Sequence, residues 1–326
     1  MNSYVLGIDI GGTKSAIILG TDSGSIIDRI QFPTEPWNGP DLALKRYAEG
    51  IASLLKEKGI HTSSVKAIGV SCGSPLDPKR GLILSPPNLP GWNAVPITEY
   101  LKHKTGIDTF LENDANACAI AEWKFGAGKG CEHMIFLTFG TGFGAGLILN
   151  GRLYGGARDM AGEIGHVRLS DEGPTGYGKV GSSEAFCSGG GIAQLAQREI
   201  LRRFQLGETV GFCPAYSDIP SITTKDVGEA AKNGDPVATE ILALSGKYLG
   251  KALSILMDLF NPERIVIGSV FARLKEFLLP SALSVIEQEV LPISRESCQI
   301  VPAALGETIG DVAALSIAIE GVKHGT

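Results

Sequence analysis

The chain opens, at residues 4–20, with YVLGIDIGGTKSAIILG, and residues 133–155 repeat the pattern as HMIFLTFGTGFGAGLILNGRLYG. In each stretch an apolar, β-branched run enters a turn rich in glycine and threonine and leaves it as a second apolar run, which is typical of an antiparallel hairpin. Gly11 and Gly140 therefore occupy equivalent places in two similar hairpins. We expect two lobes, each of which opens with a glycine hairpin.

The segments around the two hairpins alternate between strand and helix patterns. Strands are expected at 25–32, 65–72 and 263–268, and helices at 41–58, 184–204, 224–232, 235–260, 272–290 and 309–323. The fold class is therefore α/β. The proline-rich stretch 73–96 and the segment 170–183 have loop composition and are candidate walls for a substrate.

Length and composition restrict the class of protein. A chain of 326 residues exceeds what one hydrophobic core usually supports, so two domains are expected. The formal net charge of −6 gives no basic face for nucleic acid. No stretch approaches the roughly 20 apolar residues of a membrane span, and no secretory signal opens the chain. The six cysteines are scattered without a CxxC pair. We expect a cytoplasmic protein with free thiols and without nucleic-acid or membrane partners.

The first turn, Asp9-Ile10-Gly11-Gly12-Thr13-Lys14, can cradle a phosphate. Its glycines let backbone N–H groups approach an anion, and Thr13 and Lys14 add a hydroxyl and a positive charge. It is not a Walker loop, because the GxxxxGK[ST] spacing is missing and a strand follows. A hairpin that needs glycine for its turn, with Asp9 bonded to that turn, explains the same residues equally well.

The second turn runs from Gly140 to Gly146 as GTGFGAG, and alone it also has a purely structural explanation. Two such turns in equivalent places, one in each half, suit a nucleotide held between lobes with its phosphates contacted from both sides. The two turns together therefore indicate a nucleotide site more strongly than either turn does alone.

Polar residues gather at two further places. Glu112-Asn113-Asp114-Ala115-Asn116-Ala117 lies between a strand-like run and a helical stretch that ends at Phe125, so Asn113 or Asp114 can simply cap that helix. Glu163, His166 and Glu184 form a further polar set, although a helix or a surface loop explains each of them separately.

Six segments in this order resemble the ROK (repressor, ORF, kinase) family: DIGGTK, ENDANA, TFGTGFGAG, GEIGH, the glutamate of SSEAFCSGG, and NPERIVIGS. The resemblance extends from Val5 to the last helix. It implies the two-lobed actin and hexokinase-like (ribonuclease H-like) ATPase fold, in agreement with the duplicated hairpins. The expected domains are a small lobe of residues 1–115 plus 309–326 and a larger lobe of 116–308, with a hinge near 115 and 309.

The resemblance also implies an active site for phosphoryl transfer to a sugar. Asp114 matches the general base that takes the proton of the acceptor hydroxyl, and Asn113, Glu163, His166 and Glu184 match the ligands of the sugar hydroxyls. Ser74 and Asn88 are further candidates in the small lobe, where CGSP replaces a more glycine-rich turn. The residues implied for ATP are Asp9, Gly11, Gly12, Thr13, Lys14, Gly140, Thr141, Gly142, Gly268 and Ser269, with Mg²⁺ near Asp9.

One motif departs from the family. Relatives commonly carry CxCGxxGCxE, whose cysteines join the histidine in a structural zinc site, whereas residues 175–184 read TGYGKVGSSE. Thr175, Tyr177 and Ser182 stand where the thiolates would be, so we expect no structural zinc. Packing of Tyr177 and a hydroxyl bond from Thr175 or Ser182 are expected to hold this loop and to orient His166.

These resemblances imply a glucokinase-like enzyme that uses ATP and Mg²⁺ to phosphorylate a free hexose, with glucose the leading candidate. N-acetylhexosamine, fructose and allose kinases are the alternatives, because the 2-position of the sugar is not readable from these motifs. A non-catalytic sugar-sensing regulator is a less favoured alternative, since such regulators carry a DNA-binding domain before DIGGTK and only three residues precede the first strand here. The phosphate donor and a homodimeric assembly stay open.

Overall fold

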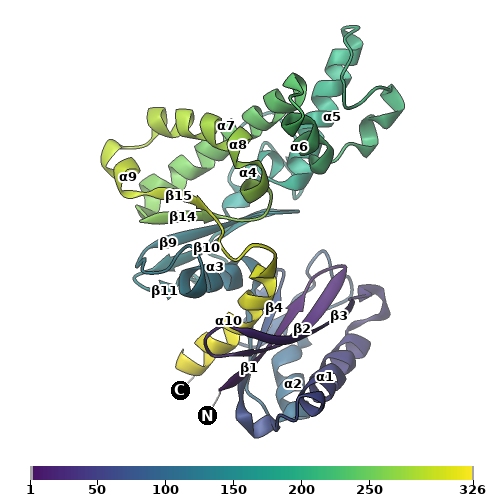
Figure 1. Ribbon diagram of the computed structural model, residues 1–326, viewed down its shortest axis with the longest axis vertical. Coiled ribbons are helices and arrows are strands. Elements are labelled where there is room, and N and C mark those ends of the chain that lie inside the picture. The colour runs from purple at the N-terminus through teal and green to yellow at the C-terminus, as the bar shows by residue number, and fades with distance from the viewer. Residues whose placement is uncertain (1–2, 325–326) are drawn as a thin grey trace.

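The computed structural model describes residues 3–324 and contains two large sheets (Figure 1). The first sheet is built from the N-terminal part of the chain. Its strands follow the order β3-β2-β1-β4-β8. The strands are β1 (Tyr4–Ile10), β2 (Lys14–Thr21), β3 (Ile26–Pro33), β4 (Val65–Cys72) and β8 (Thr109–Asn113). The first three pair antiparallel, and β4 and β8 continue parallel to β1.

The second large sheet repeats this design. Its order is β11-β10-β9-β14-β15, with β9 (Met134–Phe139), β10 (Phe143–Leu149), β11 (Arg152–Leu153), β14 (Arg264–Ile267) and β15 (Gln299–Pro302). The first three strands again form antiparallel hairpins, and β14 and β15 run parallel to β9. The predicted α/β fold with duplicated glycine hairpins is therefore confirmed.

Helices cover both sheets. The α-helices are α1 (Pro40–Glu57), α2 (Ile97–Thr105), α3 (Asp114–Phe125), α4 (Ser183–Phe186), α5 (Gly189–Gln205), α6 (Thr224–Lys232), α7 (Pro236–Phe260), α8 (Val270–Glu289), α9 (Pro292–Ser297) and α10 (Ile309–His324). The single helix expected at 184–204 is interrupted, because the Ser188 side chain accepts a hydrogen bond from the Gly191 N–H and starts α5 as a new helix. None of the helices within the described range is long and apolar enough to cross a membrane.

Both segments with loop composition contain short strands. The proline-rich stretch forms a three-stranded sheet of β5 (Leu76–Asp77), β6 (Leu82–Ile83) and β7 (Val95–Pro96). The second segment forms a hairpin of β12 (Thr175–Gly176) and β13 (Lys179–Val180). Each segment is thus a defined structure beside the site described below.

The chain passes between the sheets at two places. Strand β8 belongs to the first sheet, and α3, which follows it directly, packs on β9 and β10 of the second. Helix α10 follows β15 of the second sheet, packs on β1 and β4 of the first, and also contacts α3 (Figure 1). The domain boundaries and the hinge near 115 and 309 stay predictions.

Helix α10 approaches the first sheet closely because glycines face it. Gly7 and Gly69 are register partners in β1 and β4. A β-carbon on Gly69 would lie 2.5 Å from the Ala318 nitrogen and still closer to the Ala314 carbonyl oxygen. Both are backbone atoms of a packed helix, so they cannot yield as a flexible side chain would.

Gly69→Ala is therefore expected to destabilise the protein by about 3 kcal/mol, the cost of overpacking a tight core position. Thermal unfolding followed by circular dichroism measures the change. Gly190→Ala in α5 is the matched control, because an added β-carbon there comes no closer than 3.9 Å to the Ser188 hydroxyl. The control should be neutral or slightly stabilising. Equal melting temperatures for the two variants would contradict this account of the α10 contact.

Candidate active site

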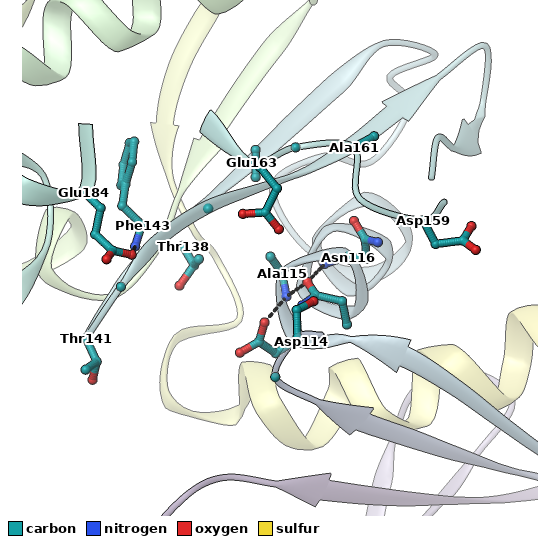
Figure 2. Close-up of a pocket in the computed structure, with 17 residues that line it drawn as sticks. Asp114, Ala115, Asn116, Thr138, Thr141, Phe143, Asp159, Ala161, Glu163 and Glu184 are labelled. Carbon is teal, nitrogen blue, oxygen red and sulfur yellow. Dashed lines mark hydrogen bonds between the residues drawn. The ribbon is translucent and has the colours of Figure 1, made fainter. Parts of the chain in front are cut away.

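Asp114 is the first residue of α3, and it projects into a pocket between the two sheets (Figure 2). The residue before it, Asn113, is the helix cap: its Oδ1 accepts the N–H groups of Ala115 at 2.9 Å and Asn116 at 3.4 Å. Its Nδ2 donates to the Ser74 hydroxyl at 2.7 Å. Capping of α3 therefore does not require Asp114, although Asp114 Oδ1 also accepts the Ala115 N–H at 2.8 Å.

Two aspartates near this pocket, Asp114 and Asp9, have raised pKa values. Asp114 is exposed to the open pocket, yet the surrounding protein partly desolvates its carboxylate and raises its pKa. The pKa of Asp9 is raised to about 6, first by burial and then by the negative charges of Asp311 and Asp114, while Arg29 acts in the opposite direction. Asp9 also lies against α10, because its Oδ2 is 2.9 Å from where a β-carbon on Gly310 would be.

The segment that carries Glu163 and His166 is fixed against β10 and α4. The Ala145 N–H donates to the Gly162 carbonyl at 2.8 Å, and a side chain at Gly165 would collide with the Phe143 carbonyl. The buried Ser183 hydroxyl lies 2.8 Å from the Ile164 carbonyl and 2.9 Å from that of Val167. Since Ser183 directly precedes Glu184, these contacts hold the three predicted sugar ligands together.

Glu184 connects this set to the second glycine hairpin. Its Oε2 accepts the Phe143 N–H at 3.1 Å and lies 2.9 Å from where a β-carbon on Gly142 would be. The second hairpin is also fixed from α5, because the Gly189 N–H donates to the Gly140 carbonyl at 2.7 Å. A side chain at position 142 would therefore displace the Glu184 carboxylate.

The pocket has a volume of about 340 Å³ and brings most of the predicted sugar residues to one space. Ser74, Asn113, Asp114, Thr141, Gly142, Glu163 and Glu184 line it. Figure 2 shows the carboxylates of Asp114 and Glu163 directed into the same space from α3 and from the opposite loop. Burial is the main cause that raises the pKa of Glu163. The charge of His166 lowers this pKa, whereas the charges of Asp114 and Glu184 raise it further.

Some predicted residues lie outside this pocket. His166 lines an adjoining cavity of about 230 Å³, which also contains Ser74, Glu163 and Glu184. Asn88 is exposed and packs beside Gly12 and Gly73. The predicted ATP residues Gly11, Gly12, Thr13, Lys14 and Gly140 do not line the pocket either.

The two residues predicted near the nucleoside line another cavity. Gly268 and Ser269 border a space of about 180 Å³ that shares Thr138 with the main pocket. Ser269 has a φ of 52°, an uncommon value for a residue other than glycine, at the point where β14 leads into α8. The two cavities adjoin at Thr138, as a nucleotide that extends from base to phosphates would need.

Several residues of the site were missed. Thr138, Asn116 and Asp159 line the main pocket, and Arg29 and Asp311 surround Asp9, with Arg29 Nε 2.8 Å from an Asp311 carboxylate oxygen. Thr138 is the next-to-last residue of β9, close before the glycine turn, and that position was a usable signal. The Arg29–Asp311 pair joins opposite ends of the chain, and no local pattern could indicate it.

The described residues of the segment that departs from the zinc motif contain no cluster of metal ligands. Across residues 3–324 no group of three or more His, Cys, Asp or Glu side chains is placed to hold a metal ion, and the absence of zinc stays a prediction. The expectation that a hydroxyl orients His166 was wrong for Ser182, whose Oγ instead accepts the Ala185 N–H at 3.3 Å as the cap of α4. The Tyr177 ring packs edge-on against His166, with centroids 5.1 Å apart.

Comparisons with known proteins agree with this geometry. The model of the ROK family matches residues 5–320. A glucokinase of Halalkalibacterium halodurans is 32% identical over 94% of this chain and 92% of its own. The crystal structure of a ROK family glucokinase from Streptomyces griseus, in complex with glucose and AMPPNP, is 28% identical and covers 98% of this chain and all of its own, with a TM-score of 0.76. The Escherichia coli DNA-binding transcriptional dual regulator NagC is 27% identical over 93% of this chain and 72% of its own.

Proposed function

The chain belongs to the ROK family, and we propose that it is a sugar kinase that transfers the γ-phosphoryl group of ATP to a hydroxyl of a free hexose. The observation that carries the proposal is the placement of Asp114. Its carboxylate is not required as the cap of α3, since Asn113 fills that role, and it lines one pocket with Glu163, Glu184 and the Thr141–Gly142 turn. Acceptors for sugar hydroxyls and a glycine turn thus lie in the same pocket as Asp114.

The proposed reaction uses each of these groups. Asn113, Glu163 and Glu184 bond the sugar hydroxyls and place the acceptor hydroxyl at Asp114. The Asp114 carboxylate takes the proton as the acceptor oxygen forms its bond to the γ-phosphorus and the bond to the β-phosphate oxygen breaks. The backbone N–H groups of the glycine turns stabilise the charge on the transferred group. ADP and the sugar phosphate are the products.

The carboxylate cluster around Asp9 fits a magnesium ion held jointly by protein and nucleotide. The negative charges of Asp311 and Asp114 act on Asp9, and the charge of Arg29 opposes them. Mg²⁺ is usually bound by one or two carboxylates together with substrate phosphates, so a protein-only ligand cluster is not required. Asp9 would hold the ion, which when bound neutralises charge on the phosphate oxygens.

Glucose is the proposed acceptor. Support comes from the names of the relatives, because the Halalkalibacterium protein is a glucokinase and the Streptomyces griseus structure contains glucose and AMPPNP. The similarity to NagC favours a second candidate, a sugar-responsive regulator that binds in the same pocket without turnover. The two functions differ in a single measurable property, the release of ADP.

A coupled assay of ADP release with ATP, Mg²⁺ and a panel of sugars tests the proposal. The panel contains glucose, mannose, fructose, allose, N-acetylglucosamine and N-acetylmannosamine. We expect release that depends on the sugar, with glucose giving the largest kcat/KM. If no sugar raises ADP release above the sugar-free rate while one of them raises the melting temperature, the protein is a sugar sensor and the kinase proposal fails.

A further inference from the structure

A further cavity, of about 330 Å³, is lined by both large sheets and shares no residue with the pockets described above. It is formed by the edge strands β8 and β11, one from each sheet, and by α3 and α10, the two helices that lie between the sheets (Figure 1). We name it the edge cavity. Its volume is near the lower end of the roughly 300 to 1,000 Å³ of ligand pockets, which suits a small molecule.

Most of the wall of the edge cavity is apolar. Leu111, Ile120 and Ile317 are buried, and Phe110 and Leu153 are half-buried. A wall of this kind favours a ligand with an apolar body, because such a ligand removes the apolar surface from water.

Two charged groups of the wall can still take a partner. The Arg152 guanidinium, from β11, forms neither an ion pair nor a hydrogen bond within residues 3–324. Glu112, from β8, is half-buried, and in the same part of the chain no group bonds to its Oε2. The Glu320 carboxylate also lines the cavity but is already paired with Lys124 at 2.6 Å. A ligand therefore meets one cation and one carboxylate oxygen that the protein leaves available.

These features together match one class of small molecule, the apolar α-amino acids. An arginine guanidinium can bind a carboxylate through two parallel hydrogen bonds, and a half-buried carboxylate favours an ammonium. An α-amino acid carries both groups on one carbon, with an apolar side chain beside them. A phosphate ester fits less well, because its negative charges would meet the Glu112 and Glu320 carboxylates.

Glu112 also connects the edge cavity to the proposed active site. Its Oε1 accepts the Asn113 N–H at 2.8 Å and a hydrogen of Asn116 Nδ2 at 2.9 Å. Asn113 caps α3 directly before Asp114, and Asn116 lines the main pocket. The Asn116 Oδ1 is buried and has no hydrogen-bond partner among the described residues, so in that part of the chain only Glu112 bonds to the Asn116 amide.

An ammonium bound at Glu112 would strengthen these contacts. Burial is the main cause that raises the pKa of Glu112, and an adjacent positive charge favours the ionised carboxylate. An ionised acceptor makes stronger hydrogen bonds to the Asn113 N–H and the Asn116 amide. The ligand should therefore fix Asn113, a proposed sugar ligand, more firmly.

We propose that the edge cavity is a regulatory site for an apolar α-amino acid, whose carboxylate binds Arg152, whose ammonium binds Glu112, and whose side chain packs on the apolar wall. Binding of the amino acid does not depend on the proposed function, whereas its effect on the sugar rests on that function. The bound amino acid increases the affinity for glucose, and glucose increases the affinity for the amino acid by the same factor. We expect a factor of about five, at the lower end of the usual coupling between sites.

Isothermal titration calorimetry with L-leucine and L-phenylalanine tests the ligand class. At least one of the two should bind. L-leucinamide and L-phenylalaninamide lack the carboxylate, whereas 4-methylpentanoate and 3-phenylpropanoate lack the ammonium. Each analogue is expected to bind at least about tenfold more weakly than its parent amino acid, as for the loss of a charged hydrogen-bond partner. L-serine, which lacks the apolar side chain, should also bind more weakly.

Arg152→Gln tests the placement of the ligand. The variant should weaken binding of the amino acid about tenfold and abolish its advantage over the amide, because no cation is left for the carboxylate. Turnover of glucose without amino acid should be unchanged. Arg198→Gln is the matched control, because Arg198 is an exposed arginine of α5 that does not line the edge cavity. It should change neither binding nor turnover.

The regulatory effect is measured as the Kd of glucose with and without saturating amino acid. A decrease of about fivefold is expected in the wild type, and the decrease should be lost in Arg152→Gln at the same amino acid concentration. An amino acid that binds without changing the Kd of glucose would refute regulation.

Three other results would overturn the site itself: no binding of either amino acid, equal weakening by Arg152→Gln and Arg198→Gln, or competition between the amino acid and glucose, which would place the amino acid in the main pocket. A protein that binds the amino acid through Arg152 but neither binds nor phosphorylates any sugar would retain the site and refute the proposed function and its regulation. The two proposals can therefore fail separately.

Discussion

Asp114→Asn is expected to lower kcat by about 10² to 10⁴-fold while the fold and most sugar binding are retained, because an amide of the same shape cannot accept the proton. The structure makes this test clean. Asn113 caps α3, and the bond from the Ala115 N–H to Asp114 Oδ1 can be kept by the amide oxygen of asparagine. Steady-state kinetics by ADP release, with sugar affinity from the shift in melting temperature, separate catalysis from binding.

Asp41→Asn is a matched control, because Asp41 is also an acidic residue in the first turn of a helix, here α1, and is exposed. Any general effect of removing a negative charge near a helix N-terminus is present in both variants. Turnover of Asp114→Asn within a few-fold of wild type would refute its role as the base.

The pH dependence of the wild-type enzyme provides a further check on Asp114. Desolvation raises its pKa above the ordinary aspartate value, and a base must be unprotonated to act. The value of kcat/KM should therefore fall as the pH is lowered, and it should do so above the pH range in which an exposed aspartate titrates. A profile that stays flat down to the ordinary range would show that the carboxylate is not the group that limits activity.

The parts of the fold that could be predicted are those with local causes. The two glycine hairpins lie within about 20 residues each, so apolar alternation and turn residues were sufficient to place them. The break at Ser188 was missed although Ser188 is followed by three glycines, a composition typical of a helix boundary.

The site was less accessible to sequence reasoning because its residues meet across long separations. Glu163 and Glu184 stand at the same pocket because Ser183 bonds the carbonyls of Ile164 and Val167, and this contact has no periodic signature. The choice between Asn113 and Asp114 as the cap also needed the structure, since both residue types favour that position. The hydroxyl bond to His166 expected from Thr175 or Ser182 is not made by Ser182, whose hydroxyl accepts the Ala185 N–H and donates to the Gly176 carbonyl.

The last prediction concerns Asp9, whose burial beside Asp311 and Asp114 raises its pKa to about 6 from the ordinary 3.8. Folding therefore strengthens proton binding at Asp9. Its favourable contribution is fully present below pH 3.8 and is lost as the pH rises through about 6. At pH 7.5 the ionised group lowers stability by at most about 3 kcal/mol, since each unit of pKa corresponds to about 1.4 kcal/mol.

Asp9→Asn should consequently raise the melting temperature at pH 7.5 in metal-free buffer and weaken the dependence of stability on pH between 4 and 6. Mg²⁺ with an ATP analogue should reduce the difference in melting temperature between Asp9→Asn and the wild type. The reason is that the bound cation offsets the charge of Asp9, which only the wild type carries. Activity should fall on the order of 10²-fold or more, since charge stabilisation at the phosphates is a large part of this catalysis. Differential scanning fluorimetry across pH and the ADP assay measure the two effects.

Asp28→Asn is the control of opposite sign. Asp28 is paired with Lys58 at 2.6 Å, and that hydrogen bond lowers its pKa, so its removal should leave the melting temperature unchanged or slightly lower it. If Asp9→Asn were destabilising at pH 7.5 without metal, the charge of Asp9 would have to be compensated within the protein, and a cation would not be needed there. If the Asp9→Asn protein is instead more stable but inactive, the Asp9 carboxylate is needed for function even though it lowers the stability of the fold.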